Sequence, residues 1–148
     1  MTSMEKLYLY NYKISPCIDC RHCKKGDHVC TLKDGMQQIY PKLTGADCII
    51  FGTPVYYYGP TGQMKLLVDR LRPYGANGKL KGKRGLVVAP SAEGAKCCGP
   101  LIKMFRMSFD YLGIRFAGKA LGTAYEKGEI VRDEREMEKA YKLGVSLK

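Results

Sequence analysis

Four cysteines lie within fourteen residues near the start of the chain, and their spacing is the feature most suggestive of chemistry. They follow the pattern C-x2-C-x2-C-x6-C, which lets one tight loop bring all four sulfurs toward a common centre. Iron–sulfur clusters are held by cysteines at such spacings, and zinc sites use related ones. Unliganded thiols and disulfides are the alternatives, but converging thiols in a polar, lysine-flanked loop make poor core residues. The predicted ligands are Cys17, Cys20, Cys23 and Cys30.

Length and composition restrict the class of protein. A chain of 148 residues is expected to form one domain, 1–148, with a core that needs no staples. No stretch is long enough to span a membrane, and the first residues lack the apolar region of a secretory signal. Seven cysteines without an export signal predict a cytoplasmic protein whose thiols serve metals or redox chemistry. Their odd number argues against a complete disulfide framework.

The chain is strongly basic, with a formal net charge of +11. Such an excess attracts nucleic acid, phosphorylated cofactors or an acidic protein partner. The basic residues are scattered, however, and the densest group, from Lys79 to Arg84, is explained equally well by a solvated loop before a strand. The charge therefore gives only a weak indication of a partner, and nucleic acid is not favoured.

Apolar patterns predict strands and helices in alternation. Leu7–Tyr12 alternates and predicts a two-faced strand, whereas two continuous apolar runs predict strands buried on both faces. The predicted strands are 7–12, 46–52, 84–89 and 115–123. Helices are expected from Asp34, which would cap the first, and at 61–71, 100–112 and 133–147. This order predicts an α/β domain with a mostly parallel sheet.

Three loops are expected at the carboxyl edge of this sheet, where ligands of such folds bind. They are the cysteine-cluster loop, 13–33, and the loops after Gly52 and Ala89. The second loop joins exposed amides, a proline and three consecutive tyrosines, which suit a planar heteroaromatic ligand; core or interface packing explains the tyrosines equally well. The third is rich in small residues that let a ligand approach the backbone.

A vicinal pair, Cys97-Cys98, follows the third loop. The two thiols could form a redox-active dithiol. Burial of two small apolar residues at the start of a helix explains the pair better.

Together these residues resemble a known family. The run Pro16–Cys23, with Cys30 and then Asp34–Met36, is similar to the compact cysteine motif of iron–sulfur flavoproteins, which belong to the NAD(P)H-dependent FMN reductase group and have a flavodoxin-like fold. Gly52–Tyr57 and Gln63–Arg70 resemble the flavin loop and following helix of that group. The likeness extends from about residue 5 to residue 147. The cysteine motif and the Thr-Pro-Val-Tyr loop are its specific parts, and the C-terminal match is not specific.

The resemblance implies an electron-transfer oxidoreductase. The four cysteines would ligate a 4Fe–4S cluster, and FMN would couple a two-electron donor, NAD(P)H, to one-electron carriers. A ferredoxin-type acidic carrier is the expected partner, and a homo-oligomer is expected. The residues implied for the isoalloxazine ring are Thr53, Pro54, Val55, Tyr56, Tyr57, Ser91, Ala92, Glu93 and Gly94.

The sequence also departs from the family pattern. The family has a strand, a serine-rich phosphate loop and a helix ahead of the segment with which this sequence begins. We therefore expect an N-terminally shortened flavodoxin-like three-layer sandwich of about four strands, with Leu7–Tyr12 paired directly with Cys48–Gly52. FMN would then bind weakly, or a partner chain would supply the phosphate contact. Gly35 stands where the family usually has a second acidic residue.

Two other functions remain open. One is a zinc-stapled basic binding module, because His22 and His28 lie within the cysteine run and eleven tyrosines could stack on bases. The other is a flavin-free remnant that acts as a subunit of a larger assembly.

Overall fold

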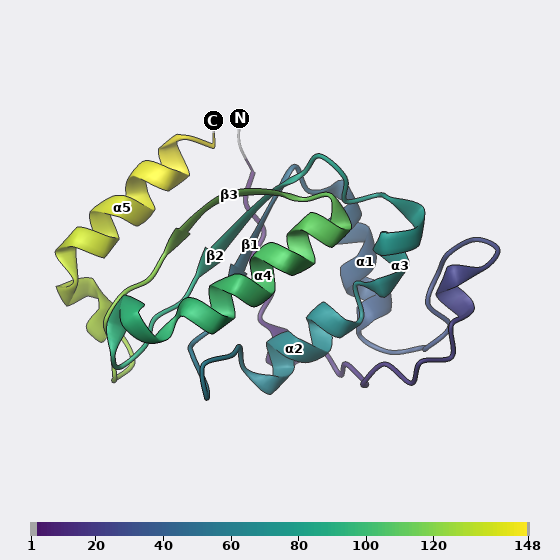
Figure 1. The fold of residues 1–148 in the computed structure, drawn as a ribbon, viewed down its shortest axis with the longest axis horizontal. Helices are drawn as coiled ribbons and strands as arrows, with labels where there is room; N and C mark the ends of the chain where they lie inside the picture. The colour runs from purple at the N-terminus through teal and green to yellow at the C-terminus, as the bar shows by residue number, and fades with distance from the viewer. Residues whose placement is uncertain (1–2, 148) are drawn as a thin grey trace.

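A parallel sheet forms the centre of the molecule (Figure 1). The computed structural model describes residues 3–147, and within this range the sheet has three strands in the order β1-β2-β3. The strands are β1 (Cys48–Gly52), β2 (Arg84–Val88) and β3 (Arg115–Ala120). Both pairs are parallel, and a bulge shifts the register of β2 against β3 between Gly85 and Leu86. The parallel α/β architecture predicted from the sequence is confirmed.

Five helices flank this sheet. Figure 1 shows α5 on one side of the strands and α1 to α4 on the other, and α5 packs against β3. The helices are α1 (Met36–Gly45), α2 (Gly62–Asp69), α3 (Arg72–Asn77), α4 (Gly99–Leu112) and α5 (Glu134–Val145). Short 3-10 turns are η1 (Leu9–Asn11), η2 (His22–Lys24), η3 (Gly94–Cys97) and η4 (Glu129–Arg132). No helix within residues 3–147 has the length and apolar character needed to cross a membrane.

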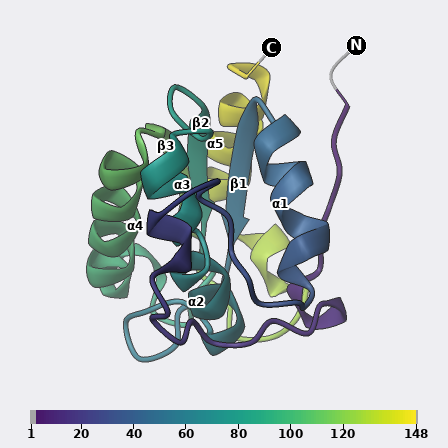
Figure 2. The same ribbon diagram turned by 90° about the vertical axis from the view of Figure 1, so that its right-hand side faces the viewer.

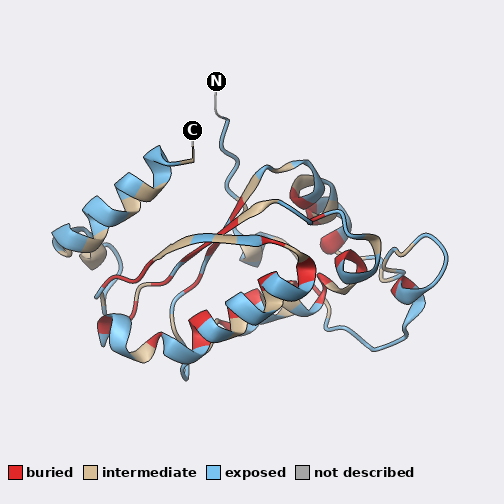
Figure 3. Cartoon of the chain, turned by 45° about the horizontal axis from the view of Figure 1, so that its top comes forward, coloured by how far each residue is buried: buried red, intermediate tan, exposed pale blue. Residues whose placement is uncertain are grey.

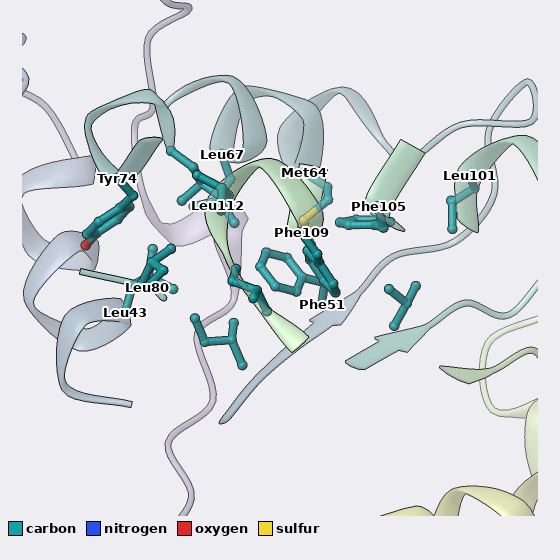
Figure 4. Close-up of a cluster of buried hydrophobic side chains, with 14 of the residues drawn as sticks. Leu43, Phe51, Met64, Leu67, Tyr74, Leu80, Leu101, Phe105, Phe109 and Leu112 are labelled. Atoms are coloured by element: carbon teal, nitrogen blue, oxygen red, sulfur yellow. The ribbon is translucent and has the colours of Figure 1, made fainter. Parts of the chain in front are cut away.

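The core lies between the sheet and the helices α1 to α4. Phe51 of β1 contacts Phe105 and Phe109 of α4, with ring centroids 5.4 and 5.2 Å apart, in the tilted arrangement that aromatic rings prefer. Figure 4 shows these rings among buried side chains from α1, α2 and α3, and Figure 3 shows burial concentrated on the strands and on one side of α4. The helices predicted from apolar stripes therefore do bury those stripes.

The opposite face of β1 is not buried, contrary to the sequence prediction. Ile49 and Phe51 are 8% and 2% exposed, whereas Ile50 between them is 50% exposed. The reason is that α5 packs against β3 and leaves this part of β1 uncovered. A continuous apolar run thus formed a strand with one buried face.

The predicted strand at Leu7–Tyr12 is wrong. This segment contains the turn η1, and it pairs with no strand in the described part of the chain. Leu7, Leu9 and Tyr12 are partly buried against the core, and the carbonyl groups of Leu9 and Tyr12 accept hydrogen bonds from the Gln63 side-chain amide, at 3.0 and 3.2 Å. The alternating pattern therefore reflects packing of one side of the segment against the core, without backbone hydrogen bonds to a neighbouring strand. Within the described residues the sheet has three strands instead of the predicted four or so.

Smaller differences concern helix limits. The helix expected at 61–71 ends at Asp69 and a second helix, α3, begins at Arg72. Pro41 lies inside α1 without ending it. Asp133 caps α5 as expected, since its carboxylate accepts a hydrogen bond from the Glu136 N–H group at 3.2 Å.

Close packing at the β2–α4 contact predicts a large effect of one added methyl group. A Cβ atom at Gly85 would lie 2.6 Å from the Phe109 ring and 2.7 Å from a methyl carbon of Ile114. We expect Gly85→Ala to lower the free energy of unfolding by about 1–3 kcal/mol, the usual cost of overpacking, as measured by urea denaturation. Gly52→Ala is the matched control, because a Cβ there meets nothing within 4 Å; equal stability of the two variants would contradict this description of the core.

Candidate functional site

The cysteine segment folds into a loop that packs against α3 (Figures 1 and 2). Cys23 is buried, Cys30 is half-buried, and Cys17 and Cys20 are exposed. All four line one small hollow that is partly open to solvent. The spacing predicted from the sequence thus brings the four residues to one place. The remaining wall comes from Ile18, Arg21, Leu32, Asp69, Arg70, Arg72 and Pro73.

The backbone of this loop is unusual. Asp19 and Arg21, on either side of Cys20, have φ angles of +50° and +58°, and His28 has +52°. Residues other than glycine rarely adopt this left-handed conformation, and it persists where surrounding structure imposes it, often at ligand sites. Alternating backbone conformations of this kind form concave anion sites, including many that hold iron–sulfur centres.

The thiols of the hollow differ in environment. Burial raises the pKa of Cys23, and negative charge on the neighbouring cysteines raises it further, although Arg72 acts in the opposite direction. By contrast, the His22 backbone and then the Thr31 hydroxyl lower the pKa of Cys20 by hydrogen bonding. The site therefore favours a thiolate at its exposed side and resists an additional negative charge at its buried side.

A buried arginine closes the hollow. Arg70 is 1% exposed, and its two terminal nitrogens donate to both carboxylate oxygens of Asp34, at 2.6 and 3.2 Å. The same nitrogens donate to the Ser15 carbonyl oxygen at 2.8 Å and to the Cys30 sulfur at 3.4 Å. Its Nε–H group is buried and has no hydrogen-bond partner among the described residues. A buried donor without an acceptor is costly, and an ordered water, an ion or a ligand atom at this position would remove that cost.

Asp34 has a second role beyond that predicted. Its carboxylate accepts hydrogen bonds from the N–H groups of Met36, at the start of α1, and of Ser15, at 3.0 and 2.8 Å. Burial by itself would raise the pKa of Asp34, but the Arg70 guanidinium and these N–H groups more than offset it and hold the pKa below its ordinary value. The sequence indicated only a helix cap, and the pairing with Arg70 was missed. The available signal was an arginine three residues after Leu67, within the helix predicted at 61–71 and directly after the last residue of α2.

The convergence of the sulfurs is incomplete. Within residues 3–147 no three side chains of His, Cys, Asp or Glu lie close enough together to hold a metal ion. Of the two histidines in the run, His28 lies with its Nδ1 atom 3.2 Å from the Cys23 carbonyl oxygen, which engages that nitrogen. Four thiols around one hollow, together with an unpartnered guanidinium donor, nevertheless fit a negatively charged cluster whose sulfur atoms accept hydrogen bonds.

The loop after β1 has a fixed base. The Thr53 hydroxyl accepts a hydrogen bond from the Thr61 N–H group at 3.1 Å and donates one to the Pro54 carbonyl oxygen at 2.9 Å. Thr61 in turn caps α2 by accepting from the Met64 N–H group at 3.2 Å. The two threonines therefore hold both ends of the loop.

The tip of this loop is strained. Tyr56 and Gly59 exchange two backbone hydrogen bonds, at 2.9 and 3.0 Å, around Tyr57 and Tyr58. Both central tyrosines have positive φ angles, +47° and +66°, in a turn that normally requires Asn-Gly. All three tyrosines are exposed, Tyr57 fully, so the structure excludes core packing as their role. The backbone strain keeps an aromatic surface in solvent, an arrangement that points to ligand or partner contacts.

The loop after β2 is joined to the end of β3. The Ser91 N–H group donates to the Gly122 carbonyl oxygen at 3.0 Å, and the Ser91 hydroxyl donates to the Gly94 carbonyl oxygen at 2.8 Å. Gly94 has a φ of +68°, and a Cβ atom there would lie 2.6 Å from the Thr123 hydroxyl oxygen. Ala92 and Glu93 are exposed at the turn, which leaves its backbone accessible.

The vicinal cysteines support the loop after β2. The sulfurs of Cys97 and Cys98 lie 3.3 and 3.5 Å from the Gly94 carbonyl oxygen, as donors. Cys98 is fully buried, and burial raises the pKa of its thiol. Cys98 therefore acts as a buried neutral thiol that helps to hold the turn.

The three predicted loops do not form one cluster. Those after β1 and β2 lie at the carboxyl edge of the sheet, whereas the cysteine hollow is lined by Asp69 and Arg70 at the end of α2 and by the start of α3. The first of these loops ends where α2 begins. The eight residues of α2 therefore separate the two regions by about 12 Å. The sequence predicted that the three loops define one site at this edge, whereas the hollow lined by the four cysteines lies at the opposite end of α2 from the loop after β1.

A parallel sheet between helices, with exposed loops at its carboxyl edge, defines a flavodoxin-like α/β protein. The family model for NADPH-dependent FMN reductases matches residues 3–122. The chain is 31% identical over 147 residues to an NAD(P)H-dependent FMN-containing oxidoreductase, YwqN of Bacillus subtilis, covering 94% of this chain and 80% of the relative. The chain therefore belongs to the NADPH-dependent FMN reductase family, whose members are flavin-dependent oxidoreductases, and a nicotinamide electron donor fits this family.

Other relatives carry iron–sulfur in their names. An iron–sulfur flavoprotein of Archaeoglobus fulgidus is 32% identical over 145 residues, covering 95% of this chain and 62% of the relative. Another, MJ1083 of Methanocaldococcus jannaschii, is 39% identical over 89 residues, covering 60% and 46%. The chain thus spans less than two thirds of the length of these two proteins.

Solved structures agree with the fold. The Trp repressor binding protein of Bacillus subtilis matches with a TM-score of 0.67 and 29% identity, covering 72% of this chain and 74% of that one. A WrbA-like flavodoxin of Agrobacterium tumefaciens matches with a TM-score of 0.54 and 20% identity, covering 74% and 71%. The flavodoxin-like fold class is confirmed.

The Arg70–Asp34 pair predicts a specific pH dependence. Asp34→Asn would leave a buried guanidinium without its charge partner, and we expect a loss of about 3–5 kcal/mol in the free energy of unfolding at neutral pH. The lowered pKa means that the folded state binds this proton more weakly than the unfolded chain. The contribution is therefore present above the ordinary value of 3.8 and is lost as the pH falls through the lower folded-state value.

Urea denaturation at neutral and acid pH measures both effects. The difference between the parent and Asp34→Asn should shrink as the pH falls below 3.8. Glu138→Gln, which breaks the exposed ion pair with Lys142, is the control and should leave stability nearly unchanged. A difference that is small at neutral pH, or independent of pH, would contradict the assignment.

Proposed function

We propose that this protein transfers electrons between FMN and a 4Fe–4S cluster ligated by Cys17, Cys20, Cys23 and Cys30. The observation that carries the proposal is that these four cysteines line one hollow together with a buried arginine whose Nε–H group has no partner within residues 3–147. When bound, FMN supplies two-electron chemistry with NAD(P)H and the cluster supplies one-electron steps. The names of the iron–sulfur relatives support this pairing.

The two loops at the sheet edge would hold the isoalloxazine ring. Thr53 fixes the first loop through hydrogen bonds to both its ends, Pro54 and Val55 continue it, and Tyr56 and Tyr57 offer exposed aromatic surface. In the second loop, from Ser91 through Ala92 and Glu93 to Gly94, small residues and an accessible turn let a planar ligand contact the backbone. No proton donor is required of these side chains, because they bind and orient the cofactor and exclude water.

The surroundings of the site suggest its partners. The net charge of +11 favours a small acidic carrier of the ferredoxin type, through steering that weakens as salt rises. The exposed tyrosines of the first loop are suited to a contact with a second copy of the chain, so we propose a homo-oligomer. We also propose a single domain, 1–148, that acts in the cytoplasm, where the thiols stay reduced.

The cluster assignment predicts a defined loading. Anaerobic reconstitution of the full chain with iron and sulfide should give about four of each per chain and a brown protein, as measured by metal and sulfide analysis and by absorbance. Cys20→Ala should lose this absorbance and keep the fold, because Cys20 is exposed. Cys48→Ala is the matched control, since Cys48 lies on β1 outside the run, and it should load fully. One equivalent of zinc without iron, with salt-sensitive nucleic-acid binding, would instead support a zinc-stapled binding module.

The FMN assignment predicts that the loop after β2 controls the affinity for FMN. Gly94→Ala forces an alanine into a left-handed backbone and against Thr123, so the turn must move. We expect FMN to bind at least about tenfold more weakly, which is about 1.4 kcal/mol, in a flavin fluorescence titration. Gly128→Ala is the control, because Gly128 has a φ of +84° but open surroundings and belongs to neither loop. If FMN added to the parent at high micromolar concentration changes neither protein nor flavin fluorescence, the protein is a flavin-free subunit.

A further inference from the structure

Two arginines at the junction of α2 and α3 contact opposite ends of the cysteine run. Arg70 and Arg72 both line the hollow. Each is paired with an aspartate of the cysteine segment, Arg70 with Asp34 and Arg72 with Asp19. The two pairs attach the segment to the end of α2 and the start of α3 from both sides.

The contact of Arg70 is buried. Its terminal nitrogen donates to the sulfur of Cys30, the last cysteine of the run, at 3.4 Å. The two terminal nitrogens also donate to the Asp34 carboxylate and to the Ser15 carbonyl oxygen. These hydrogen bonds hold the guanidinium group in one orientation. The unpartnered Nε–H group leaves one further donor on a side chain that forms the wall of the hollow.

The contact of Arg72 is more exposed. Its side chain is 29% exposed, and its aspartate partner, Asp19, is 53% exposed. Arg72 lines the hollow together with Cys17, the first cysteine of the run, and its hydrogen bond to Asp19 raises its pKa. Arg72 therefore lies at the end of the run that Arg70 does not reach.

The charges lining the hollow are unequal. Three guanidinium groups, of Arg21, Arg70 and Arg72, face one carboxylate, that of Asp69, which is paired with Lys65 at 2.6 Å. Asp19 and Asp34 bind guanidinium groups without lining the hollow themselves. Each of the three guanidinium groups is paired with an aspartate, so they offer directed hydrogen-bond donors to the hollow with little net charge.

We propose that Arg70, which donates a hydrogen bond to Cys30, and Arg72, which lines the hollow beside Cys17, are positioning residues that set the reduction potential of the cysteine-held cluster. This inference rests on the proposed function. One-electron reduction adds negative charge to the centre, so nearby cations and hydrogen bonds to the sulfurs favour the reduced state. The buried Arg70 acts in a lower dielectric and has the larger effect, and the exposed Arg72 has a smaller effect that salt screens.

The test is a redox titration of the anaerobically reconstituted full chain, followed by electron paramagnetic resonance. At the midpoint potential of the parent, the ratio of reduced to oxidised cluster should fall about threefold in Arg72→Gln at low salt, and less at high salt. In Arg70→Gln it should fall about tenfold, which is 59 mV for a one-electron couple, at either salt concentration. Arg72→Lys, which keeps the charge, should have a midpoint potential close to that of the parent.

Arg132→Gln controls for net charge. Arg132 is exposed and paired with Glu129, and its turn η4 packs beside α5, at the opposite end of the molecule from the cysteine loop (Figure 1). This variant should keep the parent potential. A potential unchanged in Arg72→Gln, or shifted equally in Arg132→Gln, overturns the inference while the proposed function stands. If Arg70→Gln does not bind the cluster, the midpoint potentials of the Arg72 variants test the inference on their own. A parent protein that binds no cluster overturns both this inference and the proposed function.

Discussion

The ion pair between Arg70 and Asp34 is the constraint on which the candidate cluster site depends. Arg70 and Asp34 have side chains only 1% and 7% exposed, and burial of two charges is costly unless nearly every hydrogen bond is made. The pair joins the end of α2, the start of α1 and the chain at Ser15. Among residues 13–33 only Ile14 and Cys23 are buried, so apolar packing contributes little there. A few charged contacts, with Arg72 and Asp19 among them, therefore determine where the cysteines lie.

Backbone strain is confined to the segments proposed to carry chemistry. In the described residues, the non-glycine positions with positive φ fall only in the cysteine loop and at the tip of the loop after β1. Each such residue raises the free energy of the folded state, so contacts elsewhere in the structure must hold it in this conformation. In the first segment the ion pairs at both ends impose the strain, and in the second the Thr53 and Thr61 hydrogen bonds do so. Strain and rigid anchoring thus occur together, as expected where ligand-binding groups must be held before the ligand arrives.

Local patterns were sufficient for most of the fold and only part of the site. Apolar runs and stripes predicted the three strands and the helices α1, α2 and α4, because those patterns record which side of an element meets the core; α5 was also expected, with Asp133 near its cap, but it buries no residue. The pattern at Leu7–Tyr12 misled, since alternation shows which side packs and not whether a neighbouring strand exists. The position of the cysteine loop against α3 was not predictable, because it depends on pairings such as Arg70 with Asp34, 36 residues apart in the chain. The arginine within the helix predicted at 61–71 was the one local sign of that pairing.

The separation of the two proposed cofactor regions follows from α2. Thr61 caps its first turn, directly after the loop proposed for FMN, and Arg70 follows its last residue, Asp69. Both ends are therefore fixed by hydrogen bonds, and the distance between the regions is set by the length of a helix instead of by a flexible connection. The partial positive end of the helix points toward the FMN loop and the partial negative end toward the cysteine hollow, where Arg70 and Arg72 offset it. The two arginines thus serve two requirements at once: they offset the helix end, and they hold the cysteine loop through Asp34 and Asp19.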